Sequence, residues 1–354
     1  MKKSIFLLFV SIAFFACSND DNVSGNGENP NGLVFEISAK TQLNETKAAG
    51  APVYSQDAAQ SVTSVSIHAF KGNGTDYLYT KTYEVSGWTA GSTFKRFAVP
   101  EADKLTVGDY KFLVIGRDAT DLYQLTAFTT STKIEDVLAT ITNSGDEYEI
   151  FAGTAQAQVL EEGGTRVSLT MTRKVAGVLG YFQNVPQLLN GSTVRYLRLI
   201  ASAGNTQVNL LSGAGITPAA SYDIINIDLS GQAVANEIYT GNDLSAAQIV
   251  KLPNSQLGGA YMIPVSDVTL TLGLYDASNN PLKVWTVYNG TASTFNILAN
   301  HFYSLGVKHK PDTTTGTDPA NPGDDDDAID LLQDQTITIT IDPAWNTIHP
   351  LTIQ

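Results

Sequence analysis

Few residues in this sequence have the types and spacing that chemistry requires. There is one cysteine, Cys17, and the four histidines are His68, His301, His309 and His349. None of the patterns H-E-x-x-H, G-x-S-x-G or P-loop occurs. The acidic residues are scattered over expected loops, so no pair can be chosen as the two carboxylates of a glycosidase. The sequence therefore predicts a protein that is not an enzyme and carries no cofactor.

Two weaker candidates for binding sites remain. His301 and His309 could approach each other on neighbouring strand positions, but a surface histidine without a metal is the more frequent case, so we predict no metal site. Trp88, Trp285 and Trp345 could stack on sugar rings, although packing in a core or an interface is the commoner role of tryptophan. A glycan-binding protein therefore stays open as an alternative function.

The position of Cys17 indicates export. After a short basic start, residues 4–15 form an almost continuous apolar run, which is too short to span a bilayer and suits the core of a signal peptide. Ala16 places a small residue directly before Cys17, as in a bacterial lipobox. We therefore expect removal of residues 1–16 and attachment of lipid such as palmitate to Cys17, with an ordinary signal peptide as the alternative. Residues 18–31 are polar, as a tether should be.

Length, composition and charge limit the class of protein. The chain has 354 residues, which corresponds to about two domains. Hydrophobic residues make up 43% of the chain, enough for folded cores. A formal net charge of −14, with no basic stripe, excludes nucleic acid as a partner, because the phosphate backbone would repel such a surface.

The dominant pattern from residue 33 onward is period-two alternation between turn residues, which is typical of strands. Strands are expected at 33–38, 62–70, 109–115, 165–172, 174–182, 194–201, 206–211, 222–229, 268–275, 282–288 and 302–308. Hairpin signals occur at 71–74, 190–191 and 289–290, and the helical candidates are 134–141 and 244–250. Many short strands between Gly and Asn turns predict an all-β protein built from sandwiches, with a boundary between domains near residue 173.

The C-terminal part changes character twice. Residues 311–327 hold three prolines, a threonine run and Asp324 to Asp327, which indicates a solvated linker. An acidic calcium loop is the alternative, but the spacing of an EF-hand loop is absent. Residues 335–341 then alternate strictly, with Ile337, Ile339 and Ile341 on one face. This apolar face must either return to its own domain or insert into another molecule.

A series of blocks along nearly the whole chain resembles a known family. The blocks are the lipobox ending at Cys17, the strand around residues 35–37, Thr46-Lys47-Ala48, residues 64–70, residues 107–114, residues 172–178 and residues 300–305. Their order is similar to that of the type V pilins of Bacteroidales, the fimbrillin family with FimA- and Mfa-type shaft subunits.

The resemblance implies two tandem transthyretin-like β-sandwich domains with an exchangeable C-terminal strand. The implied divisions are 17–47 for the tether and a removable N-terminal strand, 48–173 and 174–310 for the sandwiches, 311–334 for the acidic linker and 335–354 for the donor strand. Cleavage between Lys47 and Ala48 would remove the strand with Leu33, Phe35 and Ile37 on its apolar face. An edge left unpaired is a template for another strand.

The function implied is that of a structural subunit of a cell-surface fimbria. The precursor would be an outer-membrane lipoprotein, and the mature subunit would polymerise by donor-strand exchange with copies of itself and related subunits. The fibre would support adhesion or biofilm formation through a host or bacterial surface ligand. The alternatives are an uncleaved anchor or tip subunit of the same fimbria and a lipid-anchored glycan-binding protein.

Overall fold

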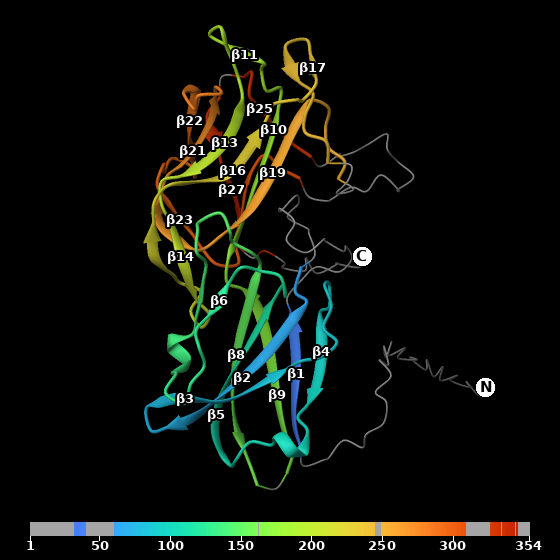
Figure 1. Cartoon of the computed structure of the whole chain (residues 1–354), viewed down its shortest axis with the longest axis vertical. Helices are drawn as coiled ribbons and strands as arrows, with labels where there is room; N and C mark the ends of the chain where they lie inside the picture. The colour runs from blue at the N-terminus through green and yellow to red at the C-terminus, as the bar shows by residue number, and fades with distance from the viewer. Residues whose placement is uncertain are drawn as a thin grey trace, which may run out of the picture.

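The computed structural model describes residues 32–39, 60–161, 163–244, 249–308, 326–333, 335–343 and 345. The described chain forms two β-lobes stacked along the long axis of the molecule (Figure 1). Strands dominate both lobes, and the helical elements among the described residues are the short 3₁₀ turns η1 (Glu101–Asp103) and η2 (Ile134–Asp136). The predicted all-β sandwich class is confirmed.

The N-terminal lobe is built on one large sheet. Its strands are β1 (Leu33–Ala39), β2 (Ser64–Asn73), β3 (Asp76–Glu84), β4 (Phe94–Ala98), β5 (Gly108–Arg117), β8 (Ile150–Val159) and β9 (Thr165–Arg173). They lie in the order β3-β2-β5-β8-β9-β1-β4, and all neighbours are antiparallel except β1 and β9. The first of the described strands, β1, therefore lies inside the sheet, between β9 and the edge strand β4 (Figure 1).

Both faces of the central strand β5 are buried because its side chains alternate between two apolar clusters. Phe112 and Val114 of β5 belong to the core cluster that β1 also enters, whereas Leu113 and Ile115 face a second cluster. The hairpin signal at 71–74 is confirmed, because Asn73 pairs with Asp76 across a turn in which Gly74 has a φ of 73°.

The C-terminal lobe contains two five-stranded sheets. Its strands are β10 (Ala176–Gln183), β13 (Tyr196–Ala201), β16 (Tyr222–Asp228), β19 (Ser255–Met262), β21 (Leu270–Tyr275), β22 (Pro281–Tyr288), β24 (Phe302–Leu305), β25 (Ile329–Asp330), β26 (Ile337–Thr338) and β27 (Thr340–Asp342). One sheet has the order β19-β10-β24-β27, with β25 beside β10, and the other has the order β16-β13-β21-β22-β26. An apolar cluster from both sheets forms the core of the lobe.

Smaller sheets complete the fold. Their strands are β6 (Gln124–Leu125), β7 (Leu138–Thr140), β11 (Leu188–Leu189), β12 (Ser192–Thr193), β14 (Gly204–Asn209), β15 (Gly215–Ala219), β17 (Val234–Ala235), β18 (Ile238–Tyr239), β20 (Val265–Val268) and β23 (Phe295–Ile297). The β11–β12 hairpin turns at Asn190 and Gly191, both with positive φ, as the Asn-Gly signal predicted.

The two lobes are joined by a shared sheet and a shared core. The sheet β15-β14-β7-β6 pairs β7, which precedes residue 173, with β14, which follows it. A third apolar cluster contains Ile134 and Ile150 from the first part of the chain and Tyr261 and Phe302 from the second. The lobes therefore meet through backbone pairing as well as through side chains, in the region that we call the junction.

One helical prediction was wrong. Residues 134–141 form η2 and then β7, because Val137, Ala139 and Ile141 are buried with a period of two and β7 pairs with β14. Of the other candidate, 244–250, residues 245–248 lie outside the described part of the chain. The expected strands at 33–38 and 282–288 match β1 and β22 closely.

Candidate functional site: the two terminal strands and the junction

Strand β1 is hydrogen-bonded on both sides. It runs parallel to β9, with Leu33 opposite Thr165 and Ala39 opposite Met171, and antiparallel to β4, with Phe35 opposite Phe97. Among the described strands, β4 pairs only with β1. Removal of β1 would therefore leave a slot with unpaired backbone on both walls.

The side chains of β1 fill the core of the N-terminal lobe. Phe35 and Ile37 are fully buried, and Leu33 is almost so. The Phe35 ring lies 4.9 Å from the Phe112 ring, edge to face, and 6.1 Å from that of Tyr83. The predicted removable strand is therefore a central structural element of this lobe.

The opposite face of β1 carries polar contacts. The Glu36 carboxylate lies 3.6 Å from the Arg166 guanidinium, and Arg96 stands opposite Glu36 in the antiparallel register. The Ser38 hydroxyl is 3.2 Å from that of Thr170. These pairs are partly exposed, so each contributes little stability but can define the register.

The C-terminal segment returns to its own lobe. The backbones of Val307 and Asp327 exchange two hydrogen bonds of 2.7 and 2.9 Å. Beside them, the Lys308 ammonium lies 3.0 Å from the Asp326 carboxylate, with both side chains fully buried, and the Tyr181 hydroxyl donates to the same carboxylate at 3.1 Å. Residues 308 and 326 thus stand side by side.

The described part of the predicted linker is packed, because β25 pairs with β10 and Leu331 is buried. The alternating strand that follows is divided between the two sheets of the lobe. β26 lies parallel to β22, and β27 lies antiparallel to β24. Ile337 and Ile339 are buried in the core of the lobe and Ile341 packs against it. The sequence left open whether this strand returns to its own domain or inserts into another molecule. In the structure the strand packs into its own C-terminal lobe.

Trp345 ends the described chain at the junction. Its ring packs against Phe302 at 5.1 Å and lies 4.0 Å from the Arg173 guanidinium. A Cβ atom at Gly177 would come within 2.7 Å of this ring, so glycine makes the space for it. The Trp345 side chain therefore covers the boundary between β9 and β10.

A buried ion pair lies beneath this ring. Arg173 Nε donates to Glu149, whose other carboxylate oxygen accepts bonds of 2.6 and 2.9 Å from the backbone and hydroxyl of Ser61. The two remaining guanidinium nitrogens of Arg173 are buried without a hydrogen-bond partner. Ser61 belongs to the segment that leads into β2, so one network connects the entry of that strand, the junction and the C-terminal tryptophan.

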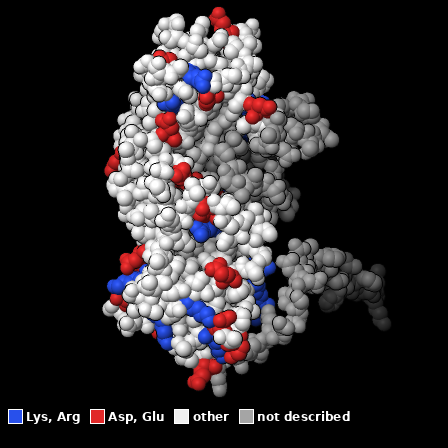
Figure 2. Space-filling view, viewed as in Figure 1, with Lys and Arg blue, Asp and Glu red and all other residues white. Residues whose placement is uncertain are grey.

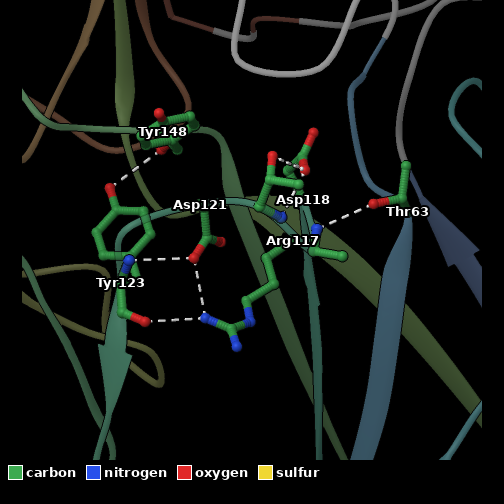
Figure 3. A network of polar contacts seen from close by, with 8 residues as sticks. Thr63, Arg117, Asp118, Asp121, Tyr123 and Tyr148 are labelled. Atoms are coloured by element: carbon green, nitrogen blue, oxygen red, sulfur yellow. Dashed lines mark hydrogen bonds and ion pairs between the residues drawn. The ribbon is translucent and has the colours of Figure 1, made fainter.

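Two further acidic groups lie near the junction. Arg117 Nη1 donates to Asp121 and to the Tyr123 carbonyl, both at 2.9 Å, and the Tyr123 hydroxyl donates to the Tyr148 carbonyl (Figure 3). Burial raises the pKa of Asp121 to about 6. Glu147 lines a cavity of about 270 Å³, and burial raises its pKa to about 7. Both carboxyl groups therefore bind a proton at a higher pH than an exposed carboxyl group does.

Among the described residues, no group of three or more His, Cys, Asp or Glu side chains could hold a metal ion. His68 is stacked on Phe128 at 4.0 Å, and burial lowers its pKa to about 3, so it is a neutral core residue. His301 bonds the Ala299 carbonyl, and His309 lies outside the described residues.

The tryptophans do not form a common platform for sugars. Trp88 and Trp345 are buried in different clusters, and Trp285 packs against a third. The proposed lipidation residue Cys17 and the processing pair Lys47 and Ala48 lie outside the described part of the chain. Among the described residues, no helix is long and apolar enough to cross a membrane.

Acidic and basic side chains are interspersed on the face shown in Figure 2, where no continuous basic stripe is visible. Sequence reasoning did not identify the buried pairs Arg173–Glu149 and Lys308–Asp326. The sequence signal that could have revealed these pairs is an arginine or lysine within an otherwise apolar alternation, as at residues 173 and 308. Its partner is 24 residues away in the first case and 18 in the second, so the pairing depends on the tertiary fold.

The buried strands of the two lobes define an all-β protein class. The family model described as "Fimbrillin-A associated anchor proteins Mfa1 and Mfa2" matches residues 35–349. The chain therefore belongs to this family of fimbrial proteins, which is not a family of enzymes. The family supports a fimbrial subunit role at the cell surface and assembly with other fimbrial proteins. No curated protein matches the chain.

Solved structures of similar proteins include the fimbrial anchor protein Mfa2 from Porphyromonas gingivalis. It is 12% identical, with a TM-score of 0.42, over 77% of this chain and 90% of that one. A fimbrial assembly protein from Parabacteroides distasonis is 10% identical, with a TM-score of 0.36, over 78% and 91%. These likenesses are weak, and the family assignment rests on the family model.

Proposed function

We propose that this chain is a lipoprotein precursor of a fimbrial subunit, in which β1 closes an acceptor slot until the chain is cleaved after Lys47. Lipid on Cys17 would hold the precursor at the outer membrane, and cleavage would separate β1 from the chain that follows. The observation that carries the proposal is the place of β1 between β9 and β4. A strand from another subunit could pair with both walls at once.

The slot is a strong binding site because it buries the apolar side chains of the strand that occupies it. Leu33, Phe35 and Ile37 are buried in the present fold. Burial of three such side chains contributes roughly 5–9 kcal/mol, at about 1.5–3 kcal/mol each, before ordering costs are subtracted. An empty slot would forfeit this contribution, so a subunit without β1 needs a replacement strand.

Donation of residues 335–341 to a neighbour is the second half of exchange. In this chain, donation requires Ile337 and Ile339 to leave the core of the C-terminal lobe and Trp345 to leave the junction. Donation is therefore proposed only where the slot of a partner subunit buries the donated strand and so offsets the loss of these contacts. A subunit that keeps its C-terminal strand would serve at the end of a fibre.

An uncleaved anchor is the second candidate function, and two observations favour it. The C-terminal strand is buried in its own lobe, and the matching family model describes anchor proteins. In an uncleaved chain, β1 would connect the lipid on Cys17 to a sheet in which it is paired on both sides. Adhesion or biofilm formation would then be supported by the fibre that it holds.

Substitution at the two proposed sites tests the function. Cys17→Ala should abolish incorporation of labelled palmitate and surface delivery. Lys47→Ala should leave a lipid-bound chain that retains β1 and does not enter fibres. Lys40→Ala is the matched control, since Lys40 is the other lysine between β1 and residue 60. Normal fibres from the Lys47→Ala strain would remove the acceptor proposal and favour the anchor.

A further inference from the structure

The slot around β1 has a shape that suits one kind of side chain at its centre. Phe35 is fully buried, and its ring is held between those of Phe112 and Tyr83. Edge-to-face packing of this kind favours an aromatic ring beyond what burial alone would give. An aliphatic side chain at this position would leave part of the space empty and lose the ring contacts.

The outer face of the slot has a matching charge pattern. Glu36 of β1 lies opposite Arg96 of β4, and its carboxylate is 3.6 Å from the guanidinium of Arg166 of β9. One acidic side chain thus stands between two basic side chains that belong to the two walls. Without β1 the two arginines would remain, so an incoming strand with an acidic residue at this position would be favoured.

We propose that the slot selects a strand with an aromatic residue at the position of Phe35 followed directly by an acidic residue, and that a subunit other than this one supplies it. The inference rests on the proposed acceptor function and specifies its partner. The selected pattern is apolar–x–aromatic–acidic–aliphatic, which β1 itself has from Leu33 to Ile37.

The chain's own C-terminal strand does not satisfy this pattern in the two parallel registers that bring Ile337 or Ile339 to the position of Leu33. With Ile337, Ile339 and Ile341 in place of the inward side chains of β1, isoleucine enters the aromatic site and Thr340 replaces the carboxylate. A shift by two residues brings Asp342 to the position of Glu36 but places Pro343 at that of Ile37. Proline has no N–H for a strand that is paired on both sides. A second copy of this chain is therefore a poor donor.

Peptide exchange on the full chain tests the selectivity. A specific protease site is inserted after Lys47, the purified protein is cleaved in vitro, and release of the noncovalently held β1 segment is measured by mass spectrometry. The competing peptides copy residues 32–40 or 334–343. Variants of the first peptide carry Phe35→Ile, Glu36→Thr or, as a matched control, Leu33→Ile.

The β1 peptide and its Leu33→Ile variant should compete about equally. Phe35→Ile should weaken competition about tenfold, which corresponds to about 1.4 kcal/mol of lost ring packing. Glu36→Thr should weaken it about threefold, in a salt-dependent manner. The peptide of residues 334–343 should be the weakest of all.

The outcomes separate the two claims. If residues 334–343 compete as well as the β1 peptide, the selectivity is refuted while the acceptor function stands. If the β1 peptide itself does not exchange, even in mild urea, the acceptor function fails and the selectivity fails with it. Equal competition by the Phe35→Ile and Leu33→Ile peptides would refute the aromatic site specifically.

Discussion

Replacement of Ile339 by alanine tests whether the C-terminal strand belongs to its own lobe. The Ile339 side chain is 4% exposed in the core of the C-terminal lobe, and its N–H donates to the Tyr288 carbonyl at 2.9 Å. Truncation of a buried isoleucine to alanine costs about 2–5 kcal/mol. Ile339→Ala should therefore lower the free energy of unfolding by an amount in that range.

The matched control is Ile341→Ala, since Ile341 is only partly buried at the edge of the same core. Its cost should be smaller, about 1 kcal/mol for partial burial. Urea unfolding followed by tryptophan fluorescence measures both variants, with hydrogen exchange in β24 as a local check. A loss below about 0.5 kcal/mol at Ile339, the usual range of surface substitutions, would show that the strand is not part of this core and is available for donation.

Three further predictions concern the junction and the C-terminal segment. In the folded state the pKa of Glu147 is raised to about 7, above its value in the unfolded chain. The protonated carboxyl group therefore stabilises the fold fully below the unfolded pKa, and this contribution is lost as the pH rises through about 7. Glu147→Gln should remove this pH dependence from the melting temperature measured between pH 5 and 8. Gly177→Ala should displace Trp345 and raise protease cleavage of the C-terminal segment, whereas unchanged cleavage would contradict the proposed close approach. Lys308→Met should destabilise the protein by about 3–5 kcal/mol because it removes the ammonium group paired with the buried Asp326 carboxylate, and adding Asp326→Leu should recover most of the loss in urea unfolding.

Much of the fold was predictable because strand alternation is a local property. β1 and β9 repeat an apolar residue at every second position, and their buried faces follow from that pattern. β8 was missed because its sequence, Ile150 to Val159, is rich in alanine and glycine, which carry little strand signal. β7 was mistaken for a helix because its apolar residues follow the short turn η2, and the spacing of the apolar residues there fits a helix as well as a strand.

The site was predictable only in part. The apolar faces of β1 and of residues 335–341 were visible in the sequence, but the partner of each face was not. Three isoleucines fit several apolar surfaces, and the choice between them depends on pairing with β22 and β24. The same limit applies to Trp345, whose place depends on the space at Gly177.

The start of the chain in assembled fibres tests the central claim most directly. Fibres would be sheared from cells, dissociated and analysed by intact-mass measurement and N-terminal sequencing. The acceptor account predicts a subunit that begins at Ala48, without lipid and without residues 33–39. A fibre-associated chain that begins at lipidated Cys17 and retains β1 would contradict it.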